Sequence, residues 1–129
     1  MYRKSKYFLW PLIIICSYNC GNKKGRELLI SSSSEFVMAD GETTTDYYKN
    51  RNAFIQPFTK VEFLKDTIKA TTLHEINSCG KTVGKIKLSN DTIYLLTEHI
   101  SREECTSVQF NKFTYLIRNS ANKRYAITF

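Results

Sequence analysis

Hydrophobic and polar residues alternate most clearly over residues 85–96 of the chain. A two-residue turn at positions 90–91 suits this stretch, because asparagine and aspartate both tolerate the positive φ that tight hairpin turns require. With this turn, the apolar residues of the two arms fall on one face, whereas a slip of one residue would mix the faces. The predicted apolar face of this hairpin consists of Ile86, Leu88, Ile93 and Leu95.

Weaker versions of the same pattern recur along the chain, with turn signals at residues 40–41, 64–67, 111–112 and 119–123. The segments between these turns are rich in β-branched and aromatic residues, which favour strands. The first turn would join strands over 35–39 and 42–48, and the second would place Val61, Phe63, Ile68 and Ala70 on one face. Short strands at this spacing predict an all-β fold, a small antiparallel meander that forms a sandwich or a barrel.

The first 25 residues have a different character. Three cations within residues 3–6 precede an apolar run over residues 7–16, and a short polar cluster then leads to Cys20. A basic start, an apolar run of about 7–15 residues and a polar exit are typical of a secretory signal peptide. The run is too short for a retained membrane span, which needs about 20 apolar residues.

Residues 1–25 resemble the N-termini of small bacterial lipoproteins, above all of the Bacteroidota type, in which a cysteine after a short hydrophobic run becomes the lipid-bearing first residue. The resemblance implies that Cys20 carries the lipid, and that the protein is exported and held at the outer membrane, facing the periplasm. Ser17 and Asn19 differ from the residues usual at the −3 and −1 positions of this motif. An ordinary signal peptide cleaved nearby, with Cys20 unmodified, is the alternative.

These features divide the chain of 129 residues into three parts. Residues 1–19 form the signal peptide, residues 20–34 the lipid-attachment site and a flexible tether that ends in four serines, and residues 35–129 a single β domain. A short edge strand over residues 28–30 is the alternative within the tether. The net charge of +7 includes the three cations of the signal, and no basic run exceeds two residues. This distribution is not that of a nucleic-acid-binding protein.

Cys79 and Cys105 are the cysteines of the predicted domain. In an exported protein they are expected to pair, and the register of the 85–96 hairpin brings them close together when its arms are extended. The alternative is a zinc-type set formed by His74, Cys79, His99 and Cys105, although a disulfide would consume both thiolates.

Tyr47, Tyr48 and Arg51 form an aromatic and basic cluster that suits a ligand or partner surface, with core packing of at least one ring as the alternative. Residues 74–75 (His-Glu) match the start of the metalloprotease helix motif, and residues 80–82 (Gly-Lys-Thr) match the end of a phosphate-binding loop. The remaining residues of both motifs are missing. We therefore predict no enzyme activity and no cofactor. The expected function is that of a non-catalytic lipoprotein that binds a protein partner or an envelope component. The alternative is a carrier of a small apolar ligand in a lipocalin-like cavity.

Overall fold

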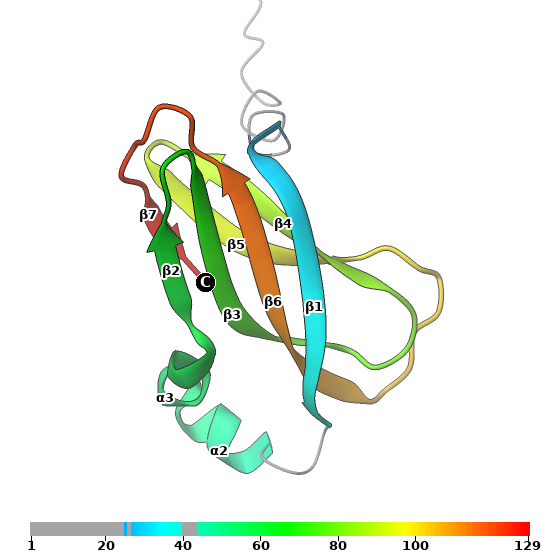
Figure 1. Cartoon of the computed structure of the whole chain (residues 1–129). Coiled ribbons are helices and arrows are strands. Elements are labelled where there is room, and N and C mark those ends of the chain that lie inside the picture. The colour runs from blue at the N-terminus through cyan, green and yellow to red at the C-terminus, as the bar shows by residue number, and fades with distance from the viewer. Residues whose placement is uncertain (1–24, 26, 40–43) are drawn as a thin grey trace, which may run out of the picture.

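The computed structural model describes Gly25 and residues 27–39 and 44–129, with the backbone alone for residues 44–46. Its strands form two sheets that pack face to face (Figure 1). The first sheet has the spatial order β1 (Leu29–Ala39), β6 (Val108–Arg118), β3 (Thr67–Asn77) and β2 (Lys60–Phe63). The second has the order β4 (Thr82–Ser89), β5 (Thr92–His99) and β7 (Ala126–Thr128). The predicted all-β fold is confirmed as a sandwich.

Two hairpins have the register that the hydrophobic pattern predicts. In the β4–β5 hairpin, Ile86 pairs with Leu95 and Leu88 pairs with Ile93. The turn residue Asn90 has a φ of 52°, as this tight turn requires. The β2–β3 hairpin likewise has the predicted pairing. In both hairpins, the alternation selects the register because one face must be buried.

The main core fills the space between the two sheets. It consists of Ile68, Ala70, Ile86, Ile93, Leu95, Phe113, Tyr115 and Ile117, none more than 1% exposed. These residues come from the central strands β3, β5 and β6 and from β4. Both predicted apolar faces therefore meet in one core.

The strand connections differ from a simple meander. β6 runs without interruption through residues 111–112, where the sequence predicts a turn, because β1 and β3 pair with it on both sides. The amide of Gln109 donates to the side chain of Asn111 over 2.9 Å, so this turn-forming residue is satisfied inside a strand. β7 pairs with β5 in parallel instead of returning along β6, so the turn at 119–123 leads across to the other sheet.

The boundary of the β domain also lies earlier than predicted. β1 begins at Leu29 and pairs with β6 along its length, so residues 29–34 of the predicted tether are a strand. The serine run fits this place because small side chains allow β1 to approach β4 closely. Ser32 donates a hydrogen bond over 3.2 Å to the carbonyl oxygen of Gly84 in β4.

Helices replace the strand predicted over residues 42–48. α2 (Thr44–Lys49), α3 (Arg51–Ile55) and the 3₁₀ turn η1 (Gln56–Phe58) connect β1 to β2 at the lower end of Figure 1. The side chain of Asn50 caps α3 by accepting a hydrogen bond from the Ala53 N–H over 3.3 Å. The predicted turn at 40–41 lies outside the described residues.

The helices bury a second apolar cluster, formed by Tyr47, Ile55, Leu73 and Phe110. By the alternation of strand side chains, Leu73 and Phe110 belong to the face of the first sheet opposite that of Thr72 and Phe113. The central sheet is therefore covered on both faces at this end.

Candidate functional site

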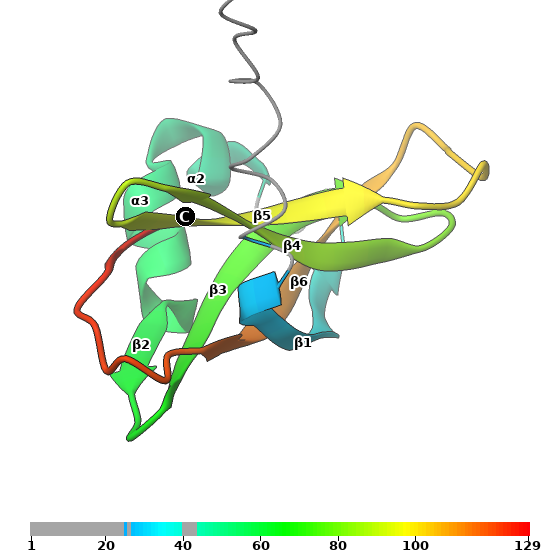
Figure 2. The same cartoon turned by 90° about the horizontal axis from the view of Figure 1, so that it is seen from above.

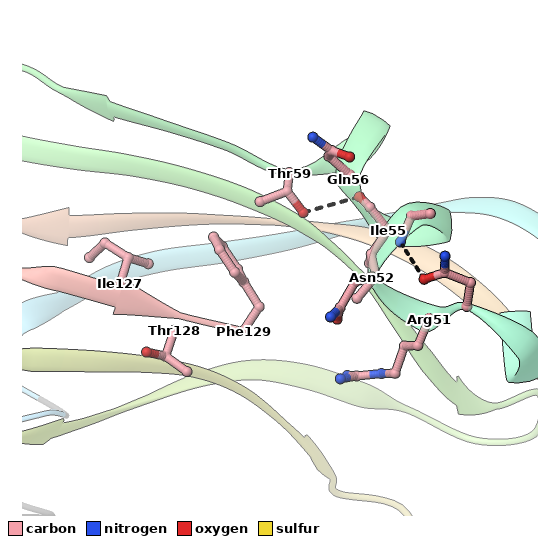
Figure 3. A pocket seen from close by; sticks show the side chains of 10 residues that line it. Arg51, Asn52, Ile55, Gln56, Thr59, Ile127, Thr128 and Phe129 are labelled. Carbon is pink, nitrogen blue, oxygen red and sulfur yellow. Dashed lines mark hydrogen bonds between the residues drawn. The ribbon is translucent and has the colours of Figure 1, made fainter.

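An open groove of about 630 Å³ lies between α3–η1 and the end of β7 (Figure 3). This volume falls within the range of about 300–1,000 Å³ that is usual for ligand sites. The groove is lined by Asn50, Arg51, Asn52, Ala53, Ile55, Gln56, Thr59, Ile127, Thr128 and Phe129. It combines side-chain amides and hydroxyls with apolar groups and one cation.

Local hydrogen bonds fix the helical wall of the groove. The Thr59 hydroxyl donates to the Ile55 carbonyl oxygen over 3.1 Å and lies 3.3 Å from the Thr72 hydroxyl of β3. The exit from η1 is thereby attached to the first sheet. Figure 3 shows Thr59 and the ring of Phe129 on facing sides of the groove.

Arg51 provides the charge of the groove. Its Nε donates to the Tyr47 hydroxyl over 3.1 Å, and Figure 3 shows its side chain extending from α3 towards the end of β7. None of the ion pairs among the described residues involves Arg51. The wall that Arg51 forms is thus suited to an anionic group.

The edge of β7 forms the opposite wall. Ala126 donates its backbone N–H to the Asp91 carbonyl over 2.9 Å, on the side of β5. Because backbone groups of successive strand residues point to opposite sides, the N–H and C=O of Ile127 point away from β5. Within the described part of the chain, β7 has β5 as its single strand neighbour. This edge can accept a further extended chain.

The two sides of the sandwich are closed differently. On one side, β1 and β4 touch at Gly84, where a Cβ would lie 2.7 Å from the Ser32 Cβ and 2.8 Å from the Tyr115 ring. On the other side, β2 and β7 form no ladder with each other. There, the Arg124 guanidinium lies 4.7 Å from the ring centre of Phe63, and the groove begins beyond this contact.

The three residues predicted to form one aromatic and basic surface lie close together but have different environments. Tyr47 is 9% exposed and belongs to the core, where its ring packs edge-on against Phe54 and Phe110. Tyr48 is 67% exposed and donates its hydroxyl to Glu75 over 3.2 Å. Arg51 alone of the three lines the groove. Tyr47 is therefore not part of an exposed surface, and the alternative of core packing holds for its ring. Tyr47 and Tyr48 are neighbours on α2, where successive side chains point in different directions.

Apart from Arg51, the groove residues were not predicted from the sequence. Asn50 as a helix cap and Pro57 at the start of a helical turn are signals that could have indicated the helical wall. The turn at 119–123 was predicted, but the parallel pairing of β7 with β5 that follows it was not, and this pairing places Phe129 beside α3.

The predicted Cys79–Cys105 disulfide is confirmed, with a Cα–Cα distance of 5.7 Å. Asn77 holds its two ends together: its side-chain oxygen accepts from both cysteine N–H groups, over 2.9 and 3.2 Å, and its amide donates to the Cys105 carbonyl oxygen over 2.6 Å. Figure 2 shows this end of the β4–β5 pair and the loop to β6 projecting from the sandwich. The disulfide fastens the two parts of this projection.

The alternative zinc set is excluded by the disulfide, since neither thiolate is available. The imidazole of His99 instead lies 2.8 Å from the Glu103 carbonyl oxygen and 3.2 Å from the Thr82 hydroxyl. Among the residues that the structure describes, no group of three or more His, Cys, Asp or Glu side chains is placed to hold a metal ion.

His74 is half-buried and lies beside Tyr115. Its Nε2 is 2.9 Å from the Tyr115 hydroxyl, which donates to the Leu96 carbonyl oxygen over 2.7 Å. Since that hydroxyl has a single proton, Nε2–H of a neutral His74 is the donor to it. Burial, and next the charge of Arg51, lower the pKa of His74 to about 4. Burial raises the pKa of Tyr115. Both groups are therefore neutral at pH 7.

Cys20 and the predicted signal segment lie outside the described residues. Within the described part of the chain, no helix has the length and apolar character needed to cross a membrane. Comparisons with protein-family models, with curated proteins and with solved structures found no match to this chain.

Proposed function

We propose that this protein is a non-catalytic lipoprotein, anchored through Cys20 at the outer membrane and facing the periplasm, that binds a protein partner or an envelope component. The observation that carries the binding role is the open groove beside the edge of β7, with the Arg51 cation on its helical wall. The segment over residues 1–25 supports the anchor, and the Cys79–Cys105 disulfide is consistent with an oxidising compartment.

The arrangement of the histidines supports a role other than catalysis. His74 is committed to the Tyr115 hydroxyl, and His99 to the loop that carries Glu103. A general base needs a free hydrogen-bonding nitrogen within reach of a substrate. Both nitrogens of His99 are hydrogen-bonded, and His74 uses its Nε2 to connect β3 to Tyr115.

A protein or envelope partner is favoured over a small apolar ligand by the location of the open space. A lipocalin-like carrier holds its ligand inside the barrel. Here the side chains of Phe113, Tyr115 and their neighbours occupy the space between the sheets. The groove is at the rim, is open to solvent and has polar side chains on its helical wall.

The binding role can be tested by site-specific photocrosslinking in intact cells. A photoreactive residue at Gln56, which lines the groove, is expected to form an adduct of defined mass with one envelope component. The matched control is the same residue at Lys87, which is exposed on β4 outside the groove. Equal labelling from both positions, or none from Gln56, would contradict the proposal.

The anchor can be tested by the intact mass of the protein extracted from its native membrane. The expected mass begins at Cys20 and includes acyl chains, and Cys20→Ala is expected to lose them. An unacylated mass of the wild-type chain would refute the anchor and leave the binding role to the crosslinking result.

A further inference from the structure

We infer that the groove receives an extended peptide segment of the partner, which pairs with the edge of β7 and places an acidic side chain against Arg51. The inference rests on the proposed binding function and specifies the chemistry of the partner. Three independent properties of the groove support it: the direction of the β7 backbone groups, the placement of the guanidinium and the apolar side chains between them.

The backbone of β7 offers the first anchor point. Ile127 directs its N–H and C=O away from β5, so an extended chain lying in the groove can exchange hydrogen bonds with it. Addition of a strand to a sheet edge is a common way to bind peptides, since main-chain bonds provide affinity and side-chain pockets provide specificity. The edges of β2 and β7 face the same side of the molecule in Figure 1, and an added strand would lie on that side.

The guanidinium of Arg51 offers the second anchor point and determines the charge of the ligand. Its Nε is held by the Tyr47 hydroxyl, whose ring is fixed in the core by Phe54 and Phe110. The bond uses Nε, so the two terminal nitrogens are directed onward and can bind a carboxylate with two hydrogen bonds. The side chains that line the groove include no carboxylate.

The apolar residues of the groove favour a peptide in which the acid has apolar neighbours. Ile127 is partly buried, and Phe129 beside it is 37% exposed. In an extended peptide, successive side chains point to opposite sides, so a residue next to the acid meets a different wall of the groove. Asn52 and Gln56 can satisfy peptide groups at the rim.

A saccharide is the other class of ligand that an arginine, amides and an aromatic ring can bind. The orientation of Ile127 favours a peptide, because a saccharide has no regular series of amide groups to pair with a strand edge. The two classes therefore differ in whether ligand binding depends on backbone amides, and this difference can be measured.

The test uses a phage-displayed library of random peptides, selected on the disulfide-intact wild-type protein. Selection is expected to enrich peptides in which an acidic residue is flanked by β-branched or aromatic residues. Arg51→Gln is expected to weaken binding of a selected peptide by about tenfold or more, since a charge-assisted hydrogen bond is lost. Arg102→Gln, the same change at an exposed site on the projecting loop, is the matched control and is expected to leave the affinity unchanged.

Backbone pairing is tested with N-methylated forms of the selected peptide. Methylation of one set of alternate amides is expected to abolish binding, whereas methylation of the other set leaves it intact. Wild-type affinity for both sets, or peptides without acidic enrichment, would overturn the inference. Binding of muropeptide saccharides without any selected peptide would also overturn it.

The photocrosslinking result separates this inference from the proposed function. A specific adduct at Gln56, together with failure of the peptide experiments, would retain the binding module and refute the acidic strand. Absence of both would refute the two together.

Discussion

The Tyr115 hydroxyl in β6 donates a hydrogen bond over 2.7 Å to the carbonyl oxygen of Leu96 in β5, and so connects the two sheets through the core. Tyr115 is fully buried, and its hydroxyl also accepts from His74. One oxygen atom of β6 therefore satisfies polar groups of two other strands, β3 and β5. In the described part of the chain, every buried side-chain nitrogen or oxygen has a hydrogen-bond partner. The hydrogen bonds to Leu96 and His74 both depend on the Tyr115 side chain.

Tyr115→Phe is expected to destabilise the protein by about 1–3 kcal/mol, because it leaves the Leu96 carbonyl and the His74 N–H without this partner while retaining the ring. The free energy of unfolding in urea measures the effect. Tyr94→Phe is the matched control, since Tyr94 lies on the exposed face of β5 and is 37% exposed. We expect the control to change stability by less than about 0.5 kcal/mol. Equal effects of the two variants would contradict the role of the Tyr115 hydroxyl.

Stability is expected to decrease as the pH falls from about 6.5 to about 4. The pKa of His74 in the folded protein is lowered to about 4 by burial and then by Arg51, whereas the unfolded chain has the ordinary value near 6.5. The unfolded state therefore binds more protons in this window, so acidification favours unfolding, by up to about 3 kcal/mol. Urea unfolding at a series of pH values measures this slope.

Two variants identify the group responsible for the pH dependence. His74→Gln is expected to reduce the loss of stability on acidification, whereas His99→Gln is expected to retain this loss. Because the charge of Arg51 contributes to the low pKa of His74, Arg51→Gln is expected to raise that pKa and to reduce the total fall. An unchanged slope in His74→Gln would show that another group causes the effect.

Removal of the disulfide, as Cys79→Ser with Cys105→Ser, is expected to cost about 3–4 kcal/mol of stability. The bridge closes a loop over a sequence separation of 26 residues, and it restricts the unfolded chain accordingly. Unfolding curves of the wild type with and without reductant, compared with the double variant, measure the cost. The reduced wild type should match the double variant, and a wild type insensitive to complete reduction would refute this estimate.

Gly84→Ala is expected to destabilise the protein by about 1–3 kcal/mol, because the added methyl group would overlap Ser32 and the Tyr115 ring. Thermal or urea unfolding measures the loss. Ser32→Gly removes one of the two overlapping groups. Gly84→Ala should therefore cost less stability in the Ser32→Gly background than in the wild type. Purely additive effects would indicate that β1 does not press on β4 at this position.

Local pattern was sufficient for two of the predicted hairpins, whose paired residues lie close together in the sequence. The β4–β5 and β2–β3 hairpins were predicted with their register, since a slip of one residue would expose their apolar faces. The disulfide was predicted because the same hairpin brings both cysteines to one end. The anchor at Cys20 stays a prediction.

Local pattern failed where a distant segment supplies the partner. Asn111 and Lys112 have the composition of a turn, but pairing of β6 with β1 and β3 holds them in a strand. The serines at 31–34 have the composition of a tether, but they fit a strand pressed against Gly84. Tyr47 became a core residue because the helix turns its ring towards Phe110.

By itself, the sequence thus determined the all-β class, the two hairpins and the covalent link between residues 79 and 105. Tertiary structure alone decided the candidate site: the groove exists because β7 crosses to pair with β5 and brings Phe129 opposite Arg51. The physical reason is that hydrophobic alternation specifies which face of a strand is buried, but not which distant strand it meets.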